Sequence, residues 1–317
     1  MSDADQTRTF LSAAGWDDAQ QTPLAGDASR RQYRRLARGD ETAVLMISPP
    51  TIDPSLPQFL TVTRALRLAG LSAPDILHED RSVGLALLED LGPTLAQRPE
   101  VPGPTTALTC TLDAILDYAE ISLDVPVAKP ETLRDALDVT GTHYPGINAE
   151  AFGGFSKGLF DYLKQIDGHR KTLSLRDVHA GNLTWLPARS GSAKIGLLDY
   201  QDAFMVHPVY DLVSLLKDAR VEYPKPLIDS LKSRYAQALG IPMDVFSLAF
   251  DVFTLQRNTR ILGLFCKLAI ADGRTAYLQY LPHVRRTLDG ALANGELGHL
   301  RADFACACPP LAKGAGG

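Results

Sequence analysis

The sequence lacks the features that mark membrane, secreted and nucleic-acid-binding proteins. No apolar run approaches the roughly 20 residues that a membrane-spanning helix needs. The N-terminal stretch MSDADQTRTF carries two acidic residues and no apolar core, so we expect no signal peptide and a cytoplasmic protein. The net charge of −5 provides no field that attracts nucleic acid or an anionic membrane, and we expect neither as a partner.

Cysteine is also scarce, and its four positions are Cys110, Cys266, Cys306 and Cys308. They are too few and too unevenly spaced for a framework of disulfides. Cys306 and Cys308 form a Cys-x-Cys pair, but no second pair accompanies it and the one nearby histidine is His299, so the pair does not predict a metal site. We expect thiols in a reducing compartment.

What is present is the composition of an ordinary globular protein, with 45% hydrophobic and 22% charged residues. Near the N-terminus, two strand-like runs, QYRRLA (32–37) and TAVLMIS (42–48), are joined by the polar turn ARGDE, which predicts an antiparallel hairpin. Residues 57–70 show helical spacing that ends at a glycine, and residues 83–92 form a further strand-like run. The N-terminal region is therefore predicted to be rich in β-structure.

The remainder of the chain has a different pattern. Apolar residues recur at steps of three and four over 105–124, 150–166 and most of 210–292, which predicts helices. A chain of 317 residues suggests about two domains. We expect an α+β fold with a β-rich unit (1–90), a mostly helical unit (91–305) and a flexible tail (306–317).

The stretch LSLRDVHAGNLTWLPARSGSAKIGLLDYQD contains three polar residues with a suggestive arrangement. The runs LTWL and KIGLLDY predict a hairpin, whose outer ends would make Asn182 and Asp199 neighbours. One carboxylate and one amide oxygen suit Mg²⁺, which keeps the rest of its shell for water and phosphate. Asp177, on the preceding loop, could accept a proton from a substrate hydroxyl. The pattern is that of a site for phosphoryl transfer, and the alternative is a set of turn-forming polar residues.

On these and other segments, the chain resembles the aminoglycoside phosphotransferase branch of the protein-kinase-like fold. More narrowly, it is similar to bacterial anomeric kinases of N-acetylmuramate and N-acetylglucosamine in cell-wall recycling. The resemblance implies a two-lobe fold, with a small β-rich N-lobe and a mostly helical C-lobe. The segments that carry it are GDAS (26–29), LMISPP (45–50), LLEDLG (87–92), LRDVHAGNL (175–183), LLDYQDA (197–203), PVYDLVSLL (208–216) and QRNTRILGLFCKLAIADG (256–273).

The resemblance implies roles for the residues of the catalytic stretch. Asp177 would be the catalytic base, and Asn182 and Asp199 would be Mg²⁺ ligands. His179 would contact the substrate side of the base, or it would stabilise the loop by a hydrogen bond. Asp202 would touch substrate or a second cation, unless its role is structural.

The resemblance also implies an ATP site. The small residues of the GDAS turn would let backbone N–H groups approach a phosphate, although an ordinary β-turn has the same composition. The connection after the 83–92 strand would hold adenine through backbone groups and an apolar slot. The residues predicted to contact the nucleotide are Gly26, Asp27, Ser29, Arg34, Glu89 and Leu91.

The sequence departs from the family pattern at two places. Leu175 stands where a histidine usually precedes the catalytic loop, and Met46 stands where a lysine grips the α- and β-phosphates. The helix predicted over 57–70 has no glutamate to pair with such a lysine, so both partners of an interior ion pair are absent together. We expect an arginine from 30–35 to replace the lysine.

The acceptor is predicted from a basic helical face. Arg257, Arg260 and Lys267 lie three and seven residues apart, and Asn258 lies beside them. A sugar with a lactyl carboxylate would suit Arg257 and Arg260, whereas a polycationic aminoglycoside would not. A solvated helix face is the structural alternative. The alternative functions are an aminoglycoside or choline-like phosphotransferase and a nucleotide-binding pseudokinase.

Overall fold

The computed structural model describes residues 3–24 and 31–311. The chain forms two compact units, each held together by contacts within it. The first unit combines Met1–Val125 with Leu175–Ala203, and the second combines Pro126–Ser174 with Phe204–Gly317. The chain thus enters the second unit, returns to the first for a short stretch and leaves it again. Each unit is described by itself.

The first unit is built on one antiparallel sheet of five strands in the order β1-β2-β3-β5-β4. The β2–β3 hairpin confirms the predicted one, and Arg38 pairs with Glu41 across its turn. Gly39, in that turn, has a φ of 53°, a conformation that glycine adopts without steric cost. The strands are β1 (Gln20–Leu24), β2 (Gln32–Arg38), β3 (Glu41–Ile47), β4 (Ile76–Asp80) and β5 (Leu85–Glu89).

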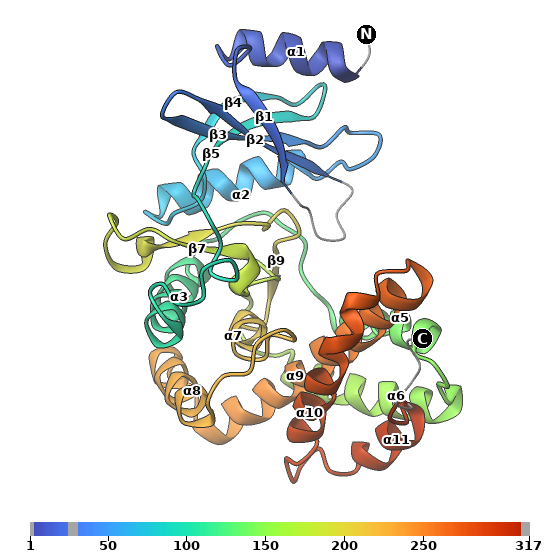
Figure 1. Ribbon diagram of the computed structural model, residues 1–317. Coiled ribbons are helices and arrows are strands. Elements are labelled where there is room, and N and C mark those ends of the chain that lie inside the picture. The colour runs from blue at the N-terminus through green and yellow to red at the C-terminus, as the bar shows by residue number, and fades with distance from the viewer. Residues whose placement is uncertain (1–2, 25–30, 312–317) are drawn as a thin grey trace. The chain divides into compact units, whose positions relative to one another are not determined.

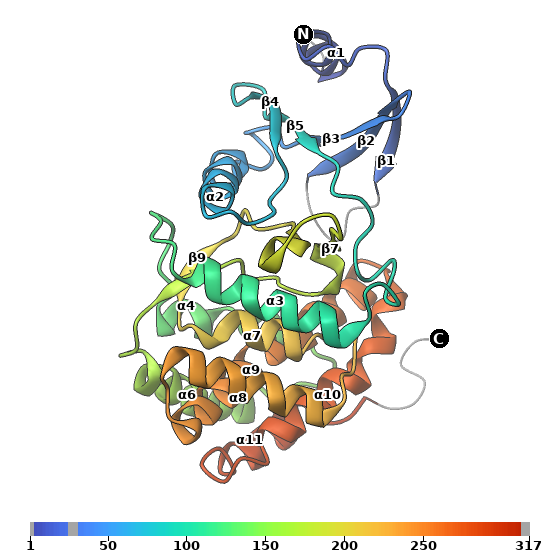
Figure 2. The same cartoon turned by 90° about the vertical axis from the view of Figure 1, so that its left-hand side faces the viewer.

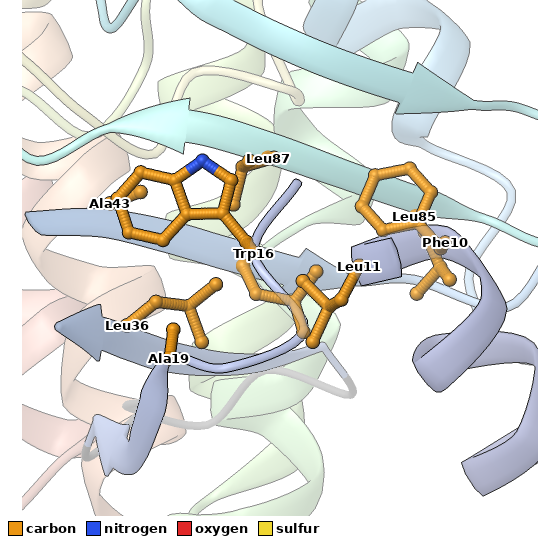
Figure 3. Packing of buried hydrophobic residues seen from close by; sticks show 9 residues of the cluster. Phe10, Leu11, Trp16, Ala19, Leu36, Ala43, Leu85 and Leu87 are labelled. Carbon is orange, nitrogen blue, oxygen red and sulfur yellow. The ribbon is translucent and has the colours of Figure 1, made fainter. Parts of the chain in front are cut away.

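The two faces of this sheet carry different helices (Figures 1 and 2). Helix α1 (Asp3–Ala13) and Trp16 cover one face, where Leu36, Leu85 and other buried side chains meet them (Figure 3). Helix α2 (Leu56–Leu68) lies on the other side of the sheet. Because side chains alternate along a strand, Met46 points away from the α1 face, and it is fully buried.

A short hairpin later in the sequence also belongs to the first unit. Strands β7 (Leu183–Trp185) and β8 (Ile195–Leu197) form it, as the sequence predicts, and helix α3 (Pro104–Ala119) packs beside it. Backbone hydrogen bonds join the hairpin to earlier segments on both sides, from Leu95 N–H to the Leu183 carbonyl (2.7 Å) and from Leu197 N–H to the Ser72 carbonyl (2.8 Å).

These bonds explain why the unit extends beyond the boundary predicted at residue 90. Tyr200, which follows the hairpin, adds a side-chain attachment to helix α2. Its ring stacks on Phe59 with centroids 5.1 Å apart, and its hydroxyl shares a 2.8 Å hydrogen bond with Thr63.

The second unit is helical apart from the pairing of β6 (Thr172–Ser174) with β9 (Phe204–Val206). Its central helix α9 is buried nearly all round, and a Cβ on Gly263 would lie 2.3 Å from the Thr140 Cα on α5. The α-helices are α4 (Pro130–Asp135), α5 (Asp138–His143), α6 (Ala149–Ile166), α7 (Val209–Leu216), α8 (Lys225–Leu239), α9 (Met243–Cys266), α10 (Leu281–Ala291) and α11 (Leu300–Ala307).

Within the described ranges no single helix has the length and apolarity to cross a membrane. Only α8 taken together with residues 243–271 passes that test, as a pair bent by 116°.

The C-terminal segment differs from the predicted tail, which was placed at 306–317. Residues 306 and 307 close helix α11, and the Cys308 side chain is fully buried. The reason is the packing of α11 on α6, where the ring of Phe304 lies 5.1 Å from that of Phe155. Residues 312–317 lie outside the described part of the chain.

Candidate active site

The loop before β7 and the turn after β8 contain two residues in an unusual backbone conformation. Arg176 has a φ of 74° and Asp199 a φ of 60°, although neither is glycine. Non-glycine residues seldom adopt positive φ, and those that do concentrate at functional sites. Arg176 directly precedes Asp177, so this backbone geometry occurs beside one predicted catalytic residue and at another.

The structure brings Asp177, Asn182 and Asp199 together. The Asn182 side-chain nitrogen donates to the Asp177 carbonyl at 3.0 Å and lies 3.4 Å from Asp199 Oδ2. The Leu198 N–H donates to the Asn182 carbonyl at 2.9 Å, which holds the outer ends of the hairpin together. Because the nitrogen of the Asn182 amide makes these contacts, its Oδ1 is the atom that can ligate a cation.

The electrostatics of this cluster favour a cation. Burial raises the pKa of the Asp199 carboxyl above its usual range, and the negative charges of Asp177 and Asp202 add to that effect. The positive charge of Arg31 acts in the opposite direction. A divalent cation would relieve the repulsion between the carboxylates. One carboxylate and one amide oxygen fit Mg²⁺, which takes few protein ligands and keeps water and phosphate in its shell.

No group of three His, Cys, Asp or Glu side chains that could hold a metal ion occurs in the parts of the chain that the structure describes. The candidate ligand set is therefore the mixed pair of Asn182 and Asp199.

His179 lies on the same loop and serves to shape it. Its Nδ1 accepts a hydrogen bond from the Gly181 N–H at 3.1 Å, and its Nε2 lies 3.4 Å from the Asn182 side-chain nitrogen. A Cβ on Gly181 would lie 2.9 Å from the imidazole, so the loop has no space for a side chain there. These contacts match the loop-stabilising alternative, and a substrate contact of His179 stays a prediction.

Asp202 lies at the end of the same segment. Its Oδ2 is 3.7 Å from Arg176 Nη1 and 3.4 Å from the Gln201 side-chain nitrogen. The Asp202 side chain is 53% exposed, so this ion pair is weak. A substrate contact of Asp202 stays a prediction.

Glu89 and Leu91, predicted beside adenine, both have contacts within the first unit. The Glu89 carboxylate accepts a hydrogen bond from Arg189 Nη2 at 2.5 Å. The Glu89 backbone N–H donates to the Asp75 carbonyl at 2.8 Å. Leu91 is buried, and its Cδ1 would lie 2.9 Å from a Cβ on Gly196 in β8. Glu89 therefore fastens the sheet to the turn between β7 and β8, and adenine binding at 89–91 stays a prediction.

Of the residues predicted on the phosphate side, Gly26, Asp27 and Ser29 lie outside the described residues. Arg34 is described, and the structure does not place it beside Asp199. It shares the strand face of Leu36, which packs against α1, and it donates to the Gln21 side chain at 3.1 Å. The choice of Arg34 therefore has no support in the geometry.

Arg31 lies within the range 30–35 from which an arginine was expected to replace the lysine, and its partner Asp53 is the residue that sequence reasoning missed. The Arg31 guanidinium lies 3.1 Å from Asp53 Oδ2 and 3.5 Å from Asp199 Oδ1. Tyr33, next on the same side of β2, is half-buried there, and the loss of water around its hydroxyl raises the pKa of that group to about 12. The alternation along β2 was the available signal, because Leu36 marks the α1 face and leaves residues 31, 33 and 35 to the other.

The predicted acceptor residues lie on α9 in the second unit. Arg257 is 4% exposed, and its guanidinium lies 5.9 Å from the centre of the Tyr210 ring. Asn258 is fully buried and donates to the Thr254 carbonyl at 3.2 Å. Arg260 is half-buried. The alternative of a solvated helix face is therefore wrong for Arg257 and Asn258.

Comparison with known proteins identifies the class that this fold and site define. The phosphotransferase enzyme family matches residues 20–246, and the chain belongs to that family. It is therefore a kinase that transfers a phosphoryl group to a hydroxyl group.

Two curated relatives are similar over nearly the whole chain. An N-acetylmuramate/N-acetylglucosamine kinase of Caulobacter vibrioides is 30% identical over 93% of this chain and 94% of its own length. One of Pseudomonas aeruginosa with the same name is 29% identical over 92% and 91%.

Solved structures agree on the fold. A choline/ethanolamine kinase family protein from Mesorhizobium loti superposes with a TM-score of 0.67 at 14% identity, covering 95% of this chain and 99% of that one. An aminoglycoside phosphotransferase from Streptomyces rimosus, solved with ADP and streptomycin, gives 0.55 at 18% identity, covering 80% and 99%. The predicted α+β, protein-kinase-like fold is confirmed.

Proposed function

We propose that the protein transfers the γ-phosphoryl group of ATP, with Mg²⁺, to the anomeric hydroxyl of N-acetylmuramate or N-acetylglucosamine, and that it acts in cell-wall recycling. The names of the relatives support the sugar as acceptor. The observation that carries the chemistry is the junction at Asn182, whose side chain contacts both the Asp177 backbone and the Asp199 carboxylate. One base and one pair of cation ligands are thereby held in a single short segment.

In this proposal each residue of the junction has one task. Asp177 accepts the proton of the sugar hydroxyl as that oxygen attacks phosphorus. Asn182 and Asp199 would hold the cation, which would supply neutralisation of the phosphate charge. His179 keeps Asn182 in place through the turn at Gly181. Catalysis then depends on positioning and on charge neutralisation, because the protein forms no covalent bond.

The acceptor is chosen by the α9 residues in this proposal. Arg257 is a buried cation, and a buried guanidinium suits a carboxylate better than a second cation. N-acetylmuramate carries a lactyl carboxylate that Arg257 and Arg260 could bind. Aminoglycosides and choline carry positive charge and would be disfavoured.

The test is an ATP-consumption assay with Mg²⁺ across N-acetylmuramate, N-acetylglucosamine, kanamycin and choline. We expect turnover with the two amino sugars alone. A reducing-sugar assay on the product identifies the phosphorylated position, because phosphorylation at C1 removes the reducing end. Turnover with kanamycin or choline instead, or ATP binding without turnover of any acceptor, would refute the proposal. Asp177→Asn is the control that separates enzymatic turnover from contaminating ATPase activity.

A further inference from the structure

One arginine of the first unit is buried against carboxylates next to the candidate active site. Arg31 directly precedes β2, and its side chain is 7% exposed. Its Nε lies 3.1 Å from Asp53 Oδ2, and its Nη2 lies 3.5 Å from Asp199 Oδ1. One guanidinium thus contacts two carboxylates, of which Asp199 is the candidate cation ligand.

The first of these carboxylates is fixed in place by its own surroundings. The Asp53 side chain is 16% exposed, and its Oδ1 accepts the Ser55 N–H at 2.9 Å just before α2 begins. Ser48 directly follows β3, and its hydroxyl donates a hydrogen bond to the Asp53 carbonyl at 3.0 Å. Asp53 is therefore tied to β3 and to the start of α2, and it can hold Arg31 whatever happens at Asp199.

The second carboxylate is less enclosed. The Asp199 side chain is 42% exposed, compared with 16% for Asp53. Asp177 and Asp199 carry like charges in the same cluster, and with Asp53 they outnumber the one guanidinium. Arg31, Asp53, Asp177 and Asp199 have a formal net charge of −2, and the neighbouring ion pair of Arg176 with Asp202 adds none, so one divalent cation would balance the cluster.

The strand register places Arg31 on the same face of the sheet as Met46, the position at which the resemblance implies a lysine. Tyr33 pairs with Met46 across β2 and β3, and Arg31 is two residues before Tyr33 on the same strand face. Met46 is fully buried and has no group that binds an anion. Arg35 lies on this face as well, but it pairs with Asp90 at 2.7 Å. Arg31 is thus the arginine of this face that contacts the cation ligand.

We propose that Arg31 is the residue that binds the nucleotide phosphates, and that Asp53 is the anchor that keeps it in position. This inference rests on the proposed function of the site as a nucleotide–cation site. With a cation held at Asp199, Arg31 would leave that carboxylate and hold a phosphate oxygen, while its pairing with Asp53 would remain. A guanidinium has five N–H donors in a fixed planar arrangement, so it can hold a carboxylate and a phosphate at once.

The test compares the affinities for ATP and adenosine, measured by calorimetry with Mg²⁺ present. In Arg31→Gln, the dissociation constant of ATP should rise about 10- to 100-fold, the loss expected for hydrogen bonds to a charged group. The affinity for adenosine should stay unchanged, because adenosine carries no phosphate. Arg31→Lys keeps the charge without the planar donors, and its loss should be intermediate. Arg81→Gln is a matched control, because it removes one positive charge from an exposed turn of the same unit.

Asp53→Asn tests the anchor separately. This variant keeps Arg31 and its contact with Asp199 but removes the negative charge of residue 53. Arg31 then competes more strongly with the cation for the Asp199 carboxylate. The Mg²⁺ concentration for half-maximal ATP binding should therefore rise several-fold. The double variant with Arg31→Gln should bind ATP no more weakly than Arg31→Gln alone, because an anchor has no effect once its arginine is absent.

Three outcomes would overturn the inference: equal losses of ATP and adenosine affinity in both Arg31 variants, unchanged ATP affinity in Arg31→Gln, or a loss in Arg34→Gln instead. The binding measurement needs no sugar. A wild-type protein that binds ATP through Arg31 but phosphorylates no amino sugar would therefore refute the proposed function and leave this inference standing.

Discussion

Replacing Met46 by lysine would introduce the residue type that the resemblance to protein-kinase-like enzymes implies at this position, and we expect it to damage the protein. Met46 is fully buried, α2 supplies no glutamate, and Asp53 is already paired with Arg31. A buried charge without its partner costs about 3–5 kcal/mol. At roughly 2–4 °C per kcal/mol for chains of this size, the midpoint of thermal unfolding should fall by about 10 °C.

The assay is thermal unfolding followed by circular dichroism at pH 7 and pH 9, with Met46→Leu as the control. The leucine variant keeps volume and polarity and should lose less than about 1.5 kcal/mol. Burial lowers the pKa of an introduced lysine below its unfolded value. The unfolded chain therefore binds more protons, and stability rises with pH, so the deficit of Met46→Lys should narrow at pH 9. A Met46→Lys variant that is as stable as wild type and binds ATP more tightly would refute the reasoning, because the site would then accept the usual lysine.

Three further predictions concern the site and the core. Asp177→Asn should lower kcat by about 10²- to 10⁴-fold, while calorimetry should still detect ATP binding; a mutant with wild-type kcat would exclude Asp177 as the base. Because the pKa of Asp199 is raised, this carboxylate takes up a proton at a higher pH than an ordinary aspartate, and Mg²⁺ affinity should fall from that pH downward. Protonation of Asp199 should not lower the folding stability, since a raised pKa means that the native state favours the protonated form. A Mg²⁺ titration from pH 7.5 to 4.5 checks this, and a flat profile would contradict it. Gly263→Ala should destabilise the protein by about 1–3 kcal/mol in urea unfolding, because its Cβ would lie 2.3 Å from the Thr140 Cα; an unchanged midpoint would show that α5 can shift.

Local sequence patterns were sufficient to predict the elements that form between neighbouring segments of the chain. The β2–β3 hairpin and the β7–β8 hairpin each follow from alternating runs joined by turn residues, and both are present. The junction of Asp177, Asn182 and Asp199 followed because the outer ends of a hairpin meet. These features depend on residues that are neighbours along the chain or across one turn.

Features that depend on distant segments could not be predicted in the same way. The first unit extends past residue 90 because Leu95 bonds to Leu183, almost ninety residues later. The choice between Arg31 and Arg34 depends on which face of β2 packs on α1, which is decided by Leu36 and Trp16 together. The predicted start of the tail at residue 306 was wrong, because the packing of Phe304 on Phe155 in α6 holds helix α11, which extends to Ala307.

The bonds between the segment after β5 and the catalytic loop have a practical consequence for mutagenesis. The Ala96 N–H donates to the Ala180 carbonyl at 2.9 Å, although the Ala96 side chain is exposed. An alanine scan passes over such a position, and most substitutions there would be silent. A proline scan would reveal it, since proline removes the donor that ties this strand exit to the loop bearing the proposed base.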